Sequence, residues 1–471
     1  MRSEISGGYF SWKNYLLPLF FLIIAFSWPM QVLSQSALVG GGAYLLLVLT
    51  GALLFRGETE RFIQKGSYSW IDIALLLVGG VVLIHSILHA LLIQESAFYQ
   101  LKWLIIFGGA GYVYFYTSRY ATEAAIKATL ASIFLIAIFF SLYWIYESYL
   151  KTVLQQTHWY ANSAFDYIRS RNGFSIDEVN QSIIKTEYRA YGLQDKHTTT
   201  ASFIAVAAFA GMSLIYSKGL KYKLGLYLLT VLVLFVGMGT TAFLLFMALF
   251  PVAIALACRT YPFRAIAATV LCTILFFVCI YGISRFDFGF GLLLKNRLDI
   301  LTSQLHFLFN FAGTYVTTYG GDLNTSFPNI YKTEAMSFRD YLAAHPQVGI
   351  VGEGFVSYQK PAFPRGGDVA ITELLVTLGA PITLFLFFSI ATAILVALRQ
   401  LLFSKQAACS AAMLSFSIMV ILFMLCSLGH YNVLFKKEIL PIFTFALALL
   451  SRFSSSFISE EAMHSGLKLR T

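Results

Sequence analysis

Long apolar runs separated by short polar connections set the pattern of this chain. No Asp, Glu, Lys or Arg occurs from residue 14 to 55, from 224 to 258, or from 406 to 435. A helix that crosses a bilayer needs roughly 20 apolar residues. Each of these gaps therefore accommodates one spanning helix, and the first accommodates two. The pattern predicts an all-α, polytopic membrane protein.

When each apolar run is taken as a helix, the chain forms a single integral membrane domain over residues 1–471, a bundle of about twelve transmembrane helices. The first six are expected at 15–33, 37–55, 70–93, 100–118, 125–150 and 197–217, and the last six at 223–238, 241–258, 263–284, 370–398, 407–428 and 438–453. The first run follows a basic flank and could be a cleaved signal peptide. Its length, and the second run directly after it, favour an uncleaved helix.

The short connections orient the bundle. With the N-terminus inside, the short outer connections carry almost no basic residues before Lys436 and Lys437. The cytoplasmic connections collect Arg56, Arg61, Lys65, Arg119, Lys218, Lys221, Arg259, Arg264, Arg399 and Lys405. This asymmetry follows the positive-inside rule and predicts that both termini are cytoplasmic. Trp103 and Trp144 are expected in the aromatic belt on the outer side.

Two connections, 151–196 and 285–369, are too long to be simple turns. Both fall on the outer, periplasmic side, and each is expected to contain short helices. In the first, Ser175-Ile-Asp-Glu178 resembles a capping box at a helix start. In the second, leucines and phenylalanines alternate with charged residues over 288–312, which predicts an amphipathic helix lying on the membrane surface. Another short helix is expected near 337–345.

The composition supports the membrane class. Hydrophobic residues make up 58% of the chain and charged residues only 12%, whereas soluble domains have about 25% charged residues. Most of the basic residues behind the net charge of +10 sit singly or in pairs at the edges of apolar runs. This placement is typical of orientation signals, so no nucleic-acid partner is predicted. The five cysteines lie in apolar runs and are interpreted as small buried hydrophobes.

Familiar metal and nucleotide motifs are missing from the sequence. There is no Walker loop, no HExxH motif, no pair of metal-binding cysteines and no DxD motif. His85 and His89 share a helix face at i, i+4. Because no third ligand accompanies them, a packed polar pair is favoured over a metal site. The sequence predicts neither a metal nor a cofactor.

Ionisable residues near the centre of a bilayer are costly and usually functional. The middle of the predicted spans is nearly free of them. The outer ends of the spans collect Glu147, Arg189, His197, Asp368 and Glu373. This placement predicts an active site at the outer surface. A flippase or other transporter is the alternative class, although transporters commonly have internal repeats and polar sites at the midplane, which this sequence lacks.

Three segments resemble one known family. Arg189-Ala-Tyr-Gly-Leu-Gln-Asp-Lys-His-Thr198 looks like its Arg-x-x-Gly loop before a helix. Residues 338–355, FRDYLAAHPQVGIVGEGF, are similar to its pattern of Arg, then His-Pro, then Gly-x-Gly-Phe. Residues 368–379, DVAITELLVTLG, look like the helix start that follows. With about twelve spans and a large late outer loop, these segments resemble the O-antigen ligase and polymerase superfamily.

The resemblance implies transfer of a glycan from a polyprenyl diphosphate carrier to an acceptor hydroxyl, without a nucleotide sugar and without a metal. The partners that it implies are a lipid-linked oligosaccharide donor and acceptor in the bilayer of the bacterial inner membrane. A chain-length regulator and a flippase are expected to act alongside.

The residues in these segments suit that chemistry. A leaving diphosphate gathers negative charge, which the planar fork of an arginine matches. The acceptor hydroxyl needs a nearby proton acceptor, such as a carboxylate. The resemblance therefore implies substrate binding by Arg189, Gly192 and His197, and catalysis by Arg339, Asp368 and Glu373.

Each of these assignments also has a structural alternative. An ion pair within its own loop would account for Arg189, and a water-facing position would account for Arg339. A helix cap, a bridge to a loop lysine and a hydrogen bond to the loop are the alternatives for Asp368, Glu373 and His197. The run from 345 to 355 is interpreted as scaffold, because its glycines permit a tight turn.

Two departures from the family pattern bear on the activity. The turn Gly237-Met-Gly-Thr-Thr241 lacks the arginine that the family often has there, which leaves one phosphate-binding cation unassigned. The chain has Asp368 where ligases tend to carry His. The second departure favours a polymerase of lipid-linked repeats, and a ligase that transfers the glycan to lipid A-core is the alternative.

The predicted topology is testable with single cysteines. Cysteine placed at Ser170 or Thr325 of a Cys-less variant should react with a membrane-impermeant maleimide in intact spheroplasts, because both loops are expected outside the cytoplasm. Labelling of either position only after lysis would contradict the orientation.

Overall fold

The computed structural model describes most of the chain. The described residues are Gly42, Leu45, Leu49, Ala190 and the ranges 13–36, 69–92, 97–172, 192–194, 197–309, 315–316, 322–323, 327–355, 370–403, 408–429 and 436–464. Most of the predicted span 37–55, the predicted helix start at Ser175, and the candidate residues Arg189 and Asp368 lie outside them.

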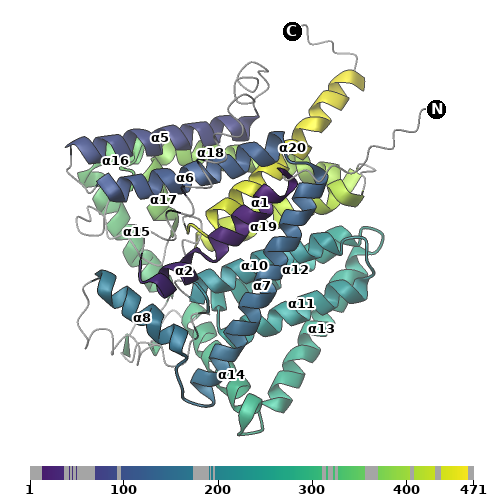
Figure 1. Ribbon diagram of the computed structural model, residues 1–471. Helices are drawn as coiled ribbons and strands as arrows, with labels where there is room; N and C mark the ends of the chain where they lie inside the picture. Colours follow the sequence, from purple (N-terminus) through teal and green to yellow (C-terminus); the bar gives the residue numbers. More distant parts are fainter. Residues whose placement is uncertain are drawn as a thin grey trace.

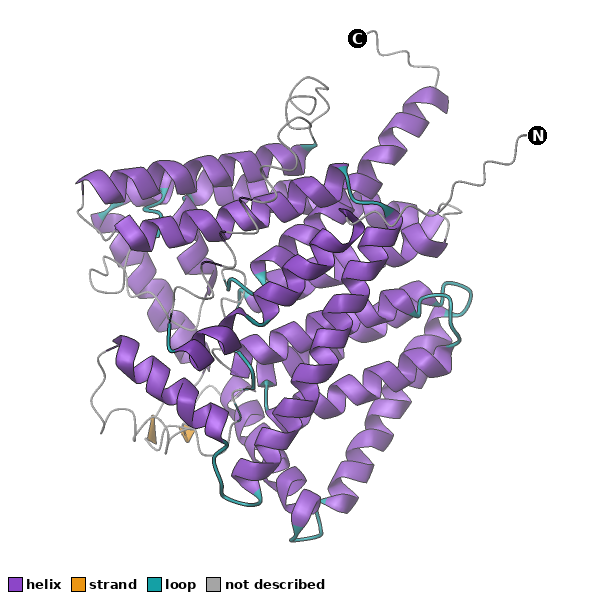
Figure 2. Cartoon of the chain, in the orientation of Figure 1, coloured by secondary structure: helices purple, strands orange, loops and turns teal. Residues whose placement is uncertain are grey.

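Helices make up nearly all of the described chain (Figures 1 and 2). In the first half they are α1 (Lys13–Ala25), α2 (Ser27–Ser34), α5 (Trp70–Leu92), α6 (Ala97–Arg119), α7 (Glu123–Thr152), α8 (Trp159–Asn172), α10 (His197–Leu214) and α11 (Leu220–Gly237). In the second half they are α12 (Thr240–Ala257), α13 (Pro262–Ile283), α14 (Gly289–Phe309), α15 (Phe327–Ala344), α16 (Pro346–Val351), α17 (Ala370–Leu378), α18 (Ala380–Phe403), α19 (Ala408–Ser427) and α20 (Leu440–His464). Two short strands, β1 (Tyr315–Val316) and β2 (Asp322–Leu323), pair antiparallel with Tyr315 opposite Leu323. The predicted all-α class is confirmed.

Eight of the described helices are long and apolar enough to cross a membrane: α5, α7, α10, α11, α12, α13, α18 and α19. Helices α1 and α2 form a ninth candidate, which is bent by 46° between Ala25 and Ser27. Helices α6 and α20 occupy the predicted spans 100–118 and 438–453 but are not among the eight. The chain is therefore a multi-pass membrane protein, and the count of twelve spans stays a prediction.

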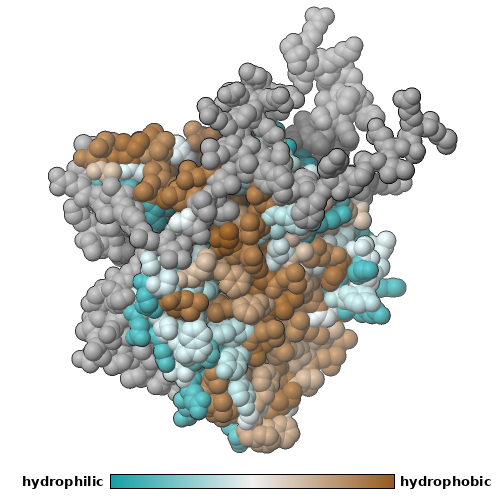
Figure 3. Space-filling model, in the orientation of Figure 1, coloured by the Kyte–Doolittle hydropathy of each residue, from teal (hydrophilic) through white to brown (hydrophobic). Residues whose placement is uncertain are grey.

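Burial separates central helices from peripheral ones. The most apolar stretch of α10 is 78% buried and that of α19 is 72% buried, whereas that of α13 is only 11% buried. Large apolar side chains of α13 point outward, with Phe263 84% exposed and Val278 61% exposed. Apolar residues cover much of the surface in Figure 3. A helix that is apolar all round and exposed suits contact with lipid.

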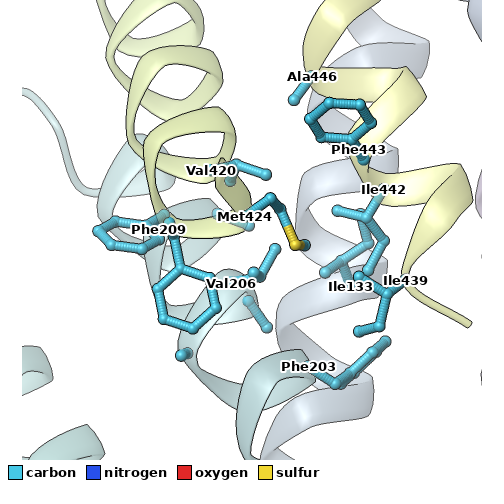
Figure 4. Packing of buried hydrophobic residues seen from close by; sticks show 14 of the residues in the cluster. Ile133, Phe203, Val206, Phe209, Val420, Met424, Ile439, Ile442, Phe443 and Ala446 are labelled. Atoms are coloured by element: carbon cyan, nitrogen blue, oxygen red, sulfur yellow. The ribbon is translucent and has the colours of Figure 1, made fainter. Parts of the chain in front are cut away.

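The core forms where α7, α10, α19 and α20 meet (Figure 4). Met424 of α19 lies between Val206 of α10 and Ile442 of α20, and all three are buried. Helix α10 is rich in alanine, and small residues let helix backbones approach closely inside a membrane. At one end of this contact, Ser213 Oγ donates a hydrogen bond to Ala412 O at 3.0 Å. Helices α10 and α19 are therefore the central pair of the bundle.

Charged residues keep to the ends of the spans. In the eight candidate helices, every Asp, Glu, Lys and Arg lies within the first or last six residues. Asp72 is fully buried near the start of α5, where it accepts hydrogen bonds from Tyr114 Oη at 2.8 Å and from Ser69 N at 2.7 Å, and pairs with Arg119 at 3.2 Å. Such partners offset the cost of burying a charge.

The predicted span 370–398 is broken, which corrects the sequence interpretation. Helix α17 ends at Leu378 and α18 begins at Ala380. Between them Gly379 has φ +79°, and a Cβ there would lie 2.4 Å from Ile350 O. Across this contact, Gly352 has φ +74°, and its Cβ would lie 2.5 Å from Thr377 O. The break exists because the chain after α16 crosses this point, backbone against backbone.

This crossing should not tolerate a side chain. Gly352→Ala is expected to lower the free energy of unfolding by about 1–2 kcal/mol from its left-handed backbone alone, and by more because its Cβ meets a carbonyl. Gly349→Ala is the matched control, because the atom nearest its Cβ, Leu342 Cδ2, is 3.6 Å away. Equal thermal unfolding of the two variants in detergent would contradict the crossing.

Candidate active site at one end of the bundle

The three segments that resemble the family lie over the same end of the bundle. Helices α10 and α19 are antiparallel, with Ser213 beside Ala412. His197 lies sixteen residues before Ser213, and Leu428 lies sixteen residues after Ala412. At 1.5 Å per residue both are about 24 Å away, at the other end of the pair. Ile371 N donates to Leu428 O at 3.0 Å, which places the start of α17 at this end as well.

The middle segment is joined to the third through its backbone. Glu353 N donates to Val376 O at 2.8 Å, and Gly354 N donates to Thr377 O at 3.0 Å. Figure 1 shows α15, α16 and α17 together at one end of the bundle, away from the start of α1 and the end of α20. The second and third segments therefore meet at the end of the bundle that also carries Gly192 and His197.

Two side chains of α7 hold the first segment. Trp144 Nε1 donates to Ala190 O at 2.8 Å, and Glu147 Oε2 accepts from Gly192 N at 2.7 Å. Gly192 has φ +73°, and a Cβ there would lie 2.7 Å from Thr200 Cγ2, so only glycine fits. Trp144 is fully buried. Its predicted place in an aromatic belt is therefore wrong, because its indole packs inside the bundle and not against lipid.

Glu147 also forms a buried ion pair. Its Oε1 lies 3.1 Å from Lys151 Nζ, and the two side chains are 1% and 7% exposed. The carboxylate also acts electrostatically on Tyr160 of α8. Burial raises the pKa of Tyr160, and the charge of Glu147 raises it further. Tyr160 therefore stays neutral at physiological pH.

Arg297 of α14 is a buried cation that the sequence interpretation missed. Its side chain is fully buried, with Nε donating to Val236 O at 2.8 Å, Nη1 to Asn296 Oδ1 at 2.9 Å and Nη2 to Thr152 Oγ1 at 3.0 Å. The predicted helix is present, but its arginine faces the bundle. The available signal was periodicity: Arg297 follows Leu293 by four residues and precedes Leu301 by four, so it shares their apolar face.

The second segment is held by side chains from α5 and α6. The carbonyls of Val351, Glu353 and Phe355 accept hydrogen bonds from His85 Nε2 at 2.9 Å, His89 Nε2 at 2.5 Å and Gln100 Nε2 at 2.9 Å. The three accepting carbonyls belong to residues two apart in the sequence, and their donors come from the neighbouring helices α5 and α6. We refer to residues 351–355 as the strap.

The strap explains the two histidines. Both of their Nε2 atoms are used on backbone carbonyls, so the interpretation of His85 and His89 as a packed polar pair is confirmed. In the part of the chain that the structure describes, no group of three or more His, Cys, Asp or Glu residues is placed to hold a metal ion.

The strap is further fixed by one ring and one carboxylate. The ring of Phe355 stacks on Trp103, with centroids 4.0 Å apart. Glu353 Oε2 accepts from Tyr341 Oη of α15 at 2.5 Å. On the same helix, Phe338 and Leu342 pack against Val348 and Val376. The run from 345 to 355 therefore ties α15 and α17 to α5 and α6, as expected of scaffold.

The remaining predicted site residues differ in their surroundings. His197 is the first residue of α10 and is partly buried; Glu373 lies in the first turn of α17 and is partly exposed. Arg339 is 73% exposed and pairs with its neighbour Asp340 at 2.8 Å. The structure thus brings Gly192 and His197 to the same end as Glu373, while Arg339 stands on the water-accessible side of α15.

Fold and composition define a multi-pass helical membrane protein with a polar layer built over one end of its bundle. No protein-family model and no curated protein sequence matches the chain. The functional argument therefore rests on the residues and on their arrangement.

Arg297 should be difficult to replace. Arg297→Lys keeps the charge but cannot reach three acceptors on different segments, because an ammonium lacks the planar fork. We expect the free energy of unfolding to fall by about 1.5–3 kcal/mol, the contribution of a hydrogen bond to a charged group. Lys295→Met is the control, because this lysine is exposed on the same helix. Loss of its ion pair with Asp287 should not change the unfolding temperature measurably. Equal unfolding temperatures for both variants would contradict the role given to Arg297.

Proposed function

We propose that this protein is a membrane glycosyltransferase that polymerises polyprenyl-diphosphate-linked oligosaccharide repeats, as O-antigen and exopolysaccharide polymerases do. The end of the bundle that carries α8, α14 and α15–α17 would face the periplasm of a bacterium, with both termini in the cytoplasm. Donor and acceptor would both be lipid-linked, so each would reach the site from the bilayer.

The observation that carries this proposal is the meeting of the three family-like segments over one end of α10 and α19. Residues 338–355 and 370–379 are joined by backbone hydrogen bonds and packing, and Gly192 and His197 lie at the same end of the bundle. An enzyme that works on lipid-linked substrates needs its chemistry at the membrane surface. The absence of charged residues from the middle of the eight candidate spans also favours surface chemistry over transport through the bundle.

The reaction would join one acceptor hydroxyl to one anomeric carbon. The hydroxyl oxygen forms a bond to C1 of the donor glycan while the bond between C1 and the diphosphate oxygen breaks. The polyprenyl diphosphate leaves with the electron pair, and the hydroxyl proton passes to a base. The protein must therefore stabilise a developing anion and accept a proton.

The proposed roles follow from these two needs. Arg189, with Gly192 and His197 beside it in the sequence, would bind the diphosphate, and Arg339 would stabilise its developing charge. The exposure of Arg339 leaves it accessible to a substrate. Asp368 or Glu373 would accept the proton, and the position of Glu373 at the start of α17 supports that role. No step in this scheme uses a metal or a cofactor.

Deletion of the gene distinguishes a polymerase from a ligase in a strain that attaches this glycan to lipopolysaccharide. Loss of a polymerase should leave core with a single repeat and remove the longer ladder on a gel. Loss of a ligase should remove even the single-repeat band, because nothing reaches the core. A deletion strain without any core-linked repeat would replace the polymerase proposal by the ligase.

The same assay tests the proposed base. Asp368→Asn should copy the deletion if the carboxylate accepts the proton. A wild-type ladder from this variant would give Asp368 a structural role, because Asn caps helices about as well as Asp.

A further inference from the structure

We propose that Trp144 and Glu147 form a two-point clamp that positions Ala190 and Gly192, just before α10. The link to substrate binding rests on the proposed function, whereas the clamp itself rests on contacts. Trp144 donates to Ala190 O and Glu147 accepts from Gly192 N. The two side chains are three residues apart on α7, so they share a face of the helix.

The clamp binds one backbone acceptor and one backbone donor. Trp144 donates to a carbonyl and Glu147 accepts from an N–H. In the sequence these two groups flank Tyr191 and follow directly after Arg189. With both groups held, the backbone at Ala190 and Gly192, beside the predicted substrate residues in the sequence, is fixed to α7. Trp144 and Glu147 are thus positioning residues rather than catalytic ones.

The clamp cannot shift as a unit, because α11 and α12 close around it. A Cβ on Gly237 would lie 2.4 Å from the Trp144 indole, and one on Gly239 would lie 3.3 Å from it. The indole therefore fills the turn between these two helices while it holds Ala190. Through Trp144, Ala190 is therefore linked to the turn 237–241, which is the turn that lacks the family's arginine.

The chemistry of Glu147 points to its acceptor role. Burying an ion pair costs desolvation, and apolar side chains of similar volume often replace such a pair without loss of stability. Packing alone would therefore not require a carboxylate at this place. A buried Gly192 N–H, in contrast, needs an acceptor.

Two double variants separate the acceptor from the charge. Glu147→Gln with Lys151→Met removes both charges but keeps an oxygen for Gly192 N–H. Glu147→Leu with Lys151→Met removes both charges and the acceptor. The matched control is Glu123→Gln with Lys127→Met, which removes an ion pair of the same i, i+4 spacing on the same helix. In that pair Lys127 Nζ lies 2.8 Å from Glu123 Oε1, and both side chains are more than half exposed.

Hydrogen–deuterium exchange of the segment measures the clamp without any substrate. In the Leu/Met variant the amides of 190–197 should exchange about tenfold faster or more, because a lost buried hydrogen bond costs about 1–3 kcal/mol. In the Gln/Met variant and in the control, exchange should stay near that of the unmodified protein. Trp144→Phe, which keeps the ring and removes the donor, should also speed exchange.

Polymerisation measures the consequence. The probe is the lipid-linked repeat extracted from the deletion strain, added to the purified full-length protein. The Leu/Met variant should require about tenfold more donor for the same rate, while Gln/Met restores the unmodified dependence on donor. A purely structural role would lower protein yield without moving this dependence.

The outcomes are separable. Equal exchange in the two double variants, or equal loss of donor affinity in both, would overturn the clamp. An unmodified protein that fails to extend the repeats would overturn the proposed function, and the exchange experiment would still decide whether Glu147 holds Gly192.

Discussion

The arrangement depends on one constraint: a backbone group released where a helix breaks must find a partner inside the protein. Where such a group is buried, no water is present to satisfy it. In this chain the partners are side chains from neighbouring helices. His85, His89 and Gln100 take the carbonyls of the strap, and Trp144 and Glu147 take the peptide groups beside Gly192. Arg297 does the same for Val236 at the end of α11.

These contacts explain why irregular chain gathers at one end of the bundle. The strap and the segment before α10 are held by α5, α6 and α7, while α10 and α19 provide the buried base beneath them. Glycines make the close approaches possible: Gly352 and Gly379 let two backbones cross, and Gly237 and Gly239 admit an indole. The result is a layer of loops on a rigid scaffold, which is the usual setting for binding and catalysis.

Much of the helical framework was predictable because apolar runs and charge gaps are strong signals. The break at Gly379 was also readable in principle, since a glycine followed two residues later by Pro381 is a typical end of one helix and start of the next. Inward and outward faces were harder to predict. Trp144 was assigned to an aromatic belt and Arg297 lies in a helix expected on the membrane surface, yet both are buried. On α7, which is apolar over most of its length, the sequence does not show which face meets protein. On α14 the shared spacing of Leu293, Arg297 and Leu301 was a usable signal.

The sequence indicated candidate site residues but not the contacts that hold them. Its candidate residues were recognised as short local patterns, and such patterns carry no record of the helix that will lie opposite. Glu147 was noticed as a charge near the end of a span, but its link to Gly192 joins residues 45 apart. Lys151 gave no signal of its own, because its i, i+4 spacing from Glu147 is the same as that of the exposed pair Glu123 and Lys127.

Attachment through the backbone has an evolutionary consequence. The indole and carboxylate of α7 recognise a carbonyl and an N–H, which every residue except proline offers. The two contacts therefore do not depend on which side chains the segment carries, whereas Ala190, Leu193 and Gln194 are held in addition by their own burial. Relatives should then keep a donor and an acceptor at the two helix positions that hold the segment, even where residues of the segment differ.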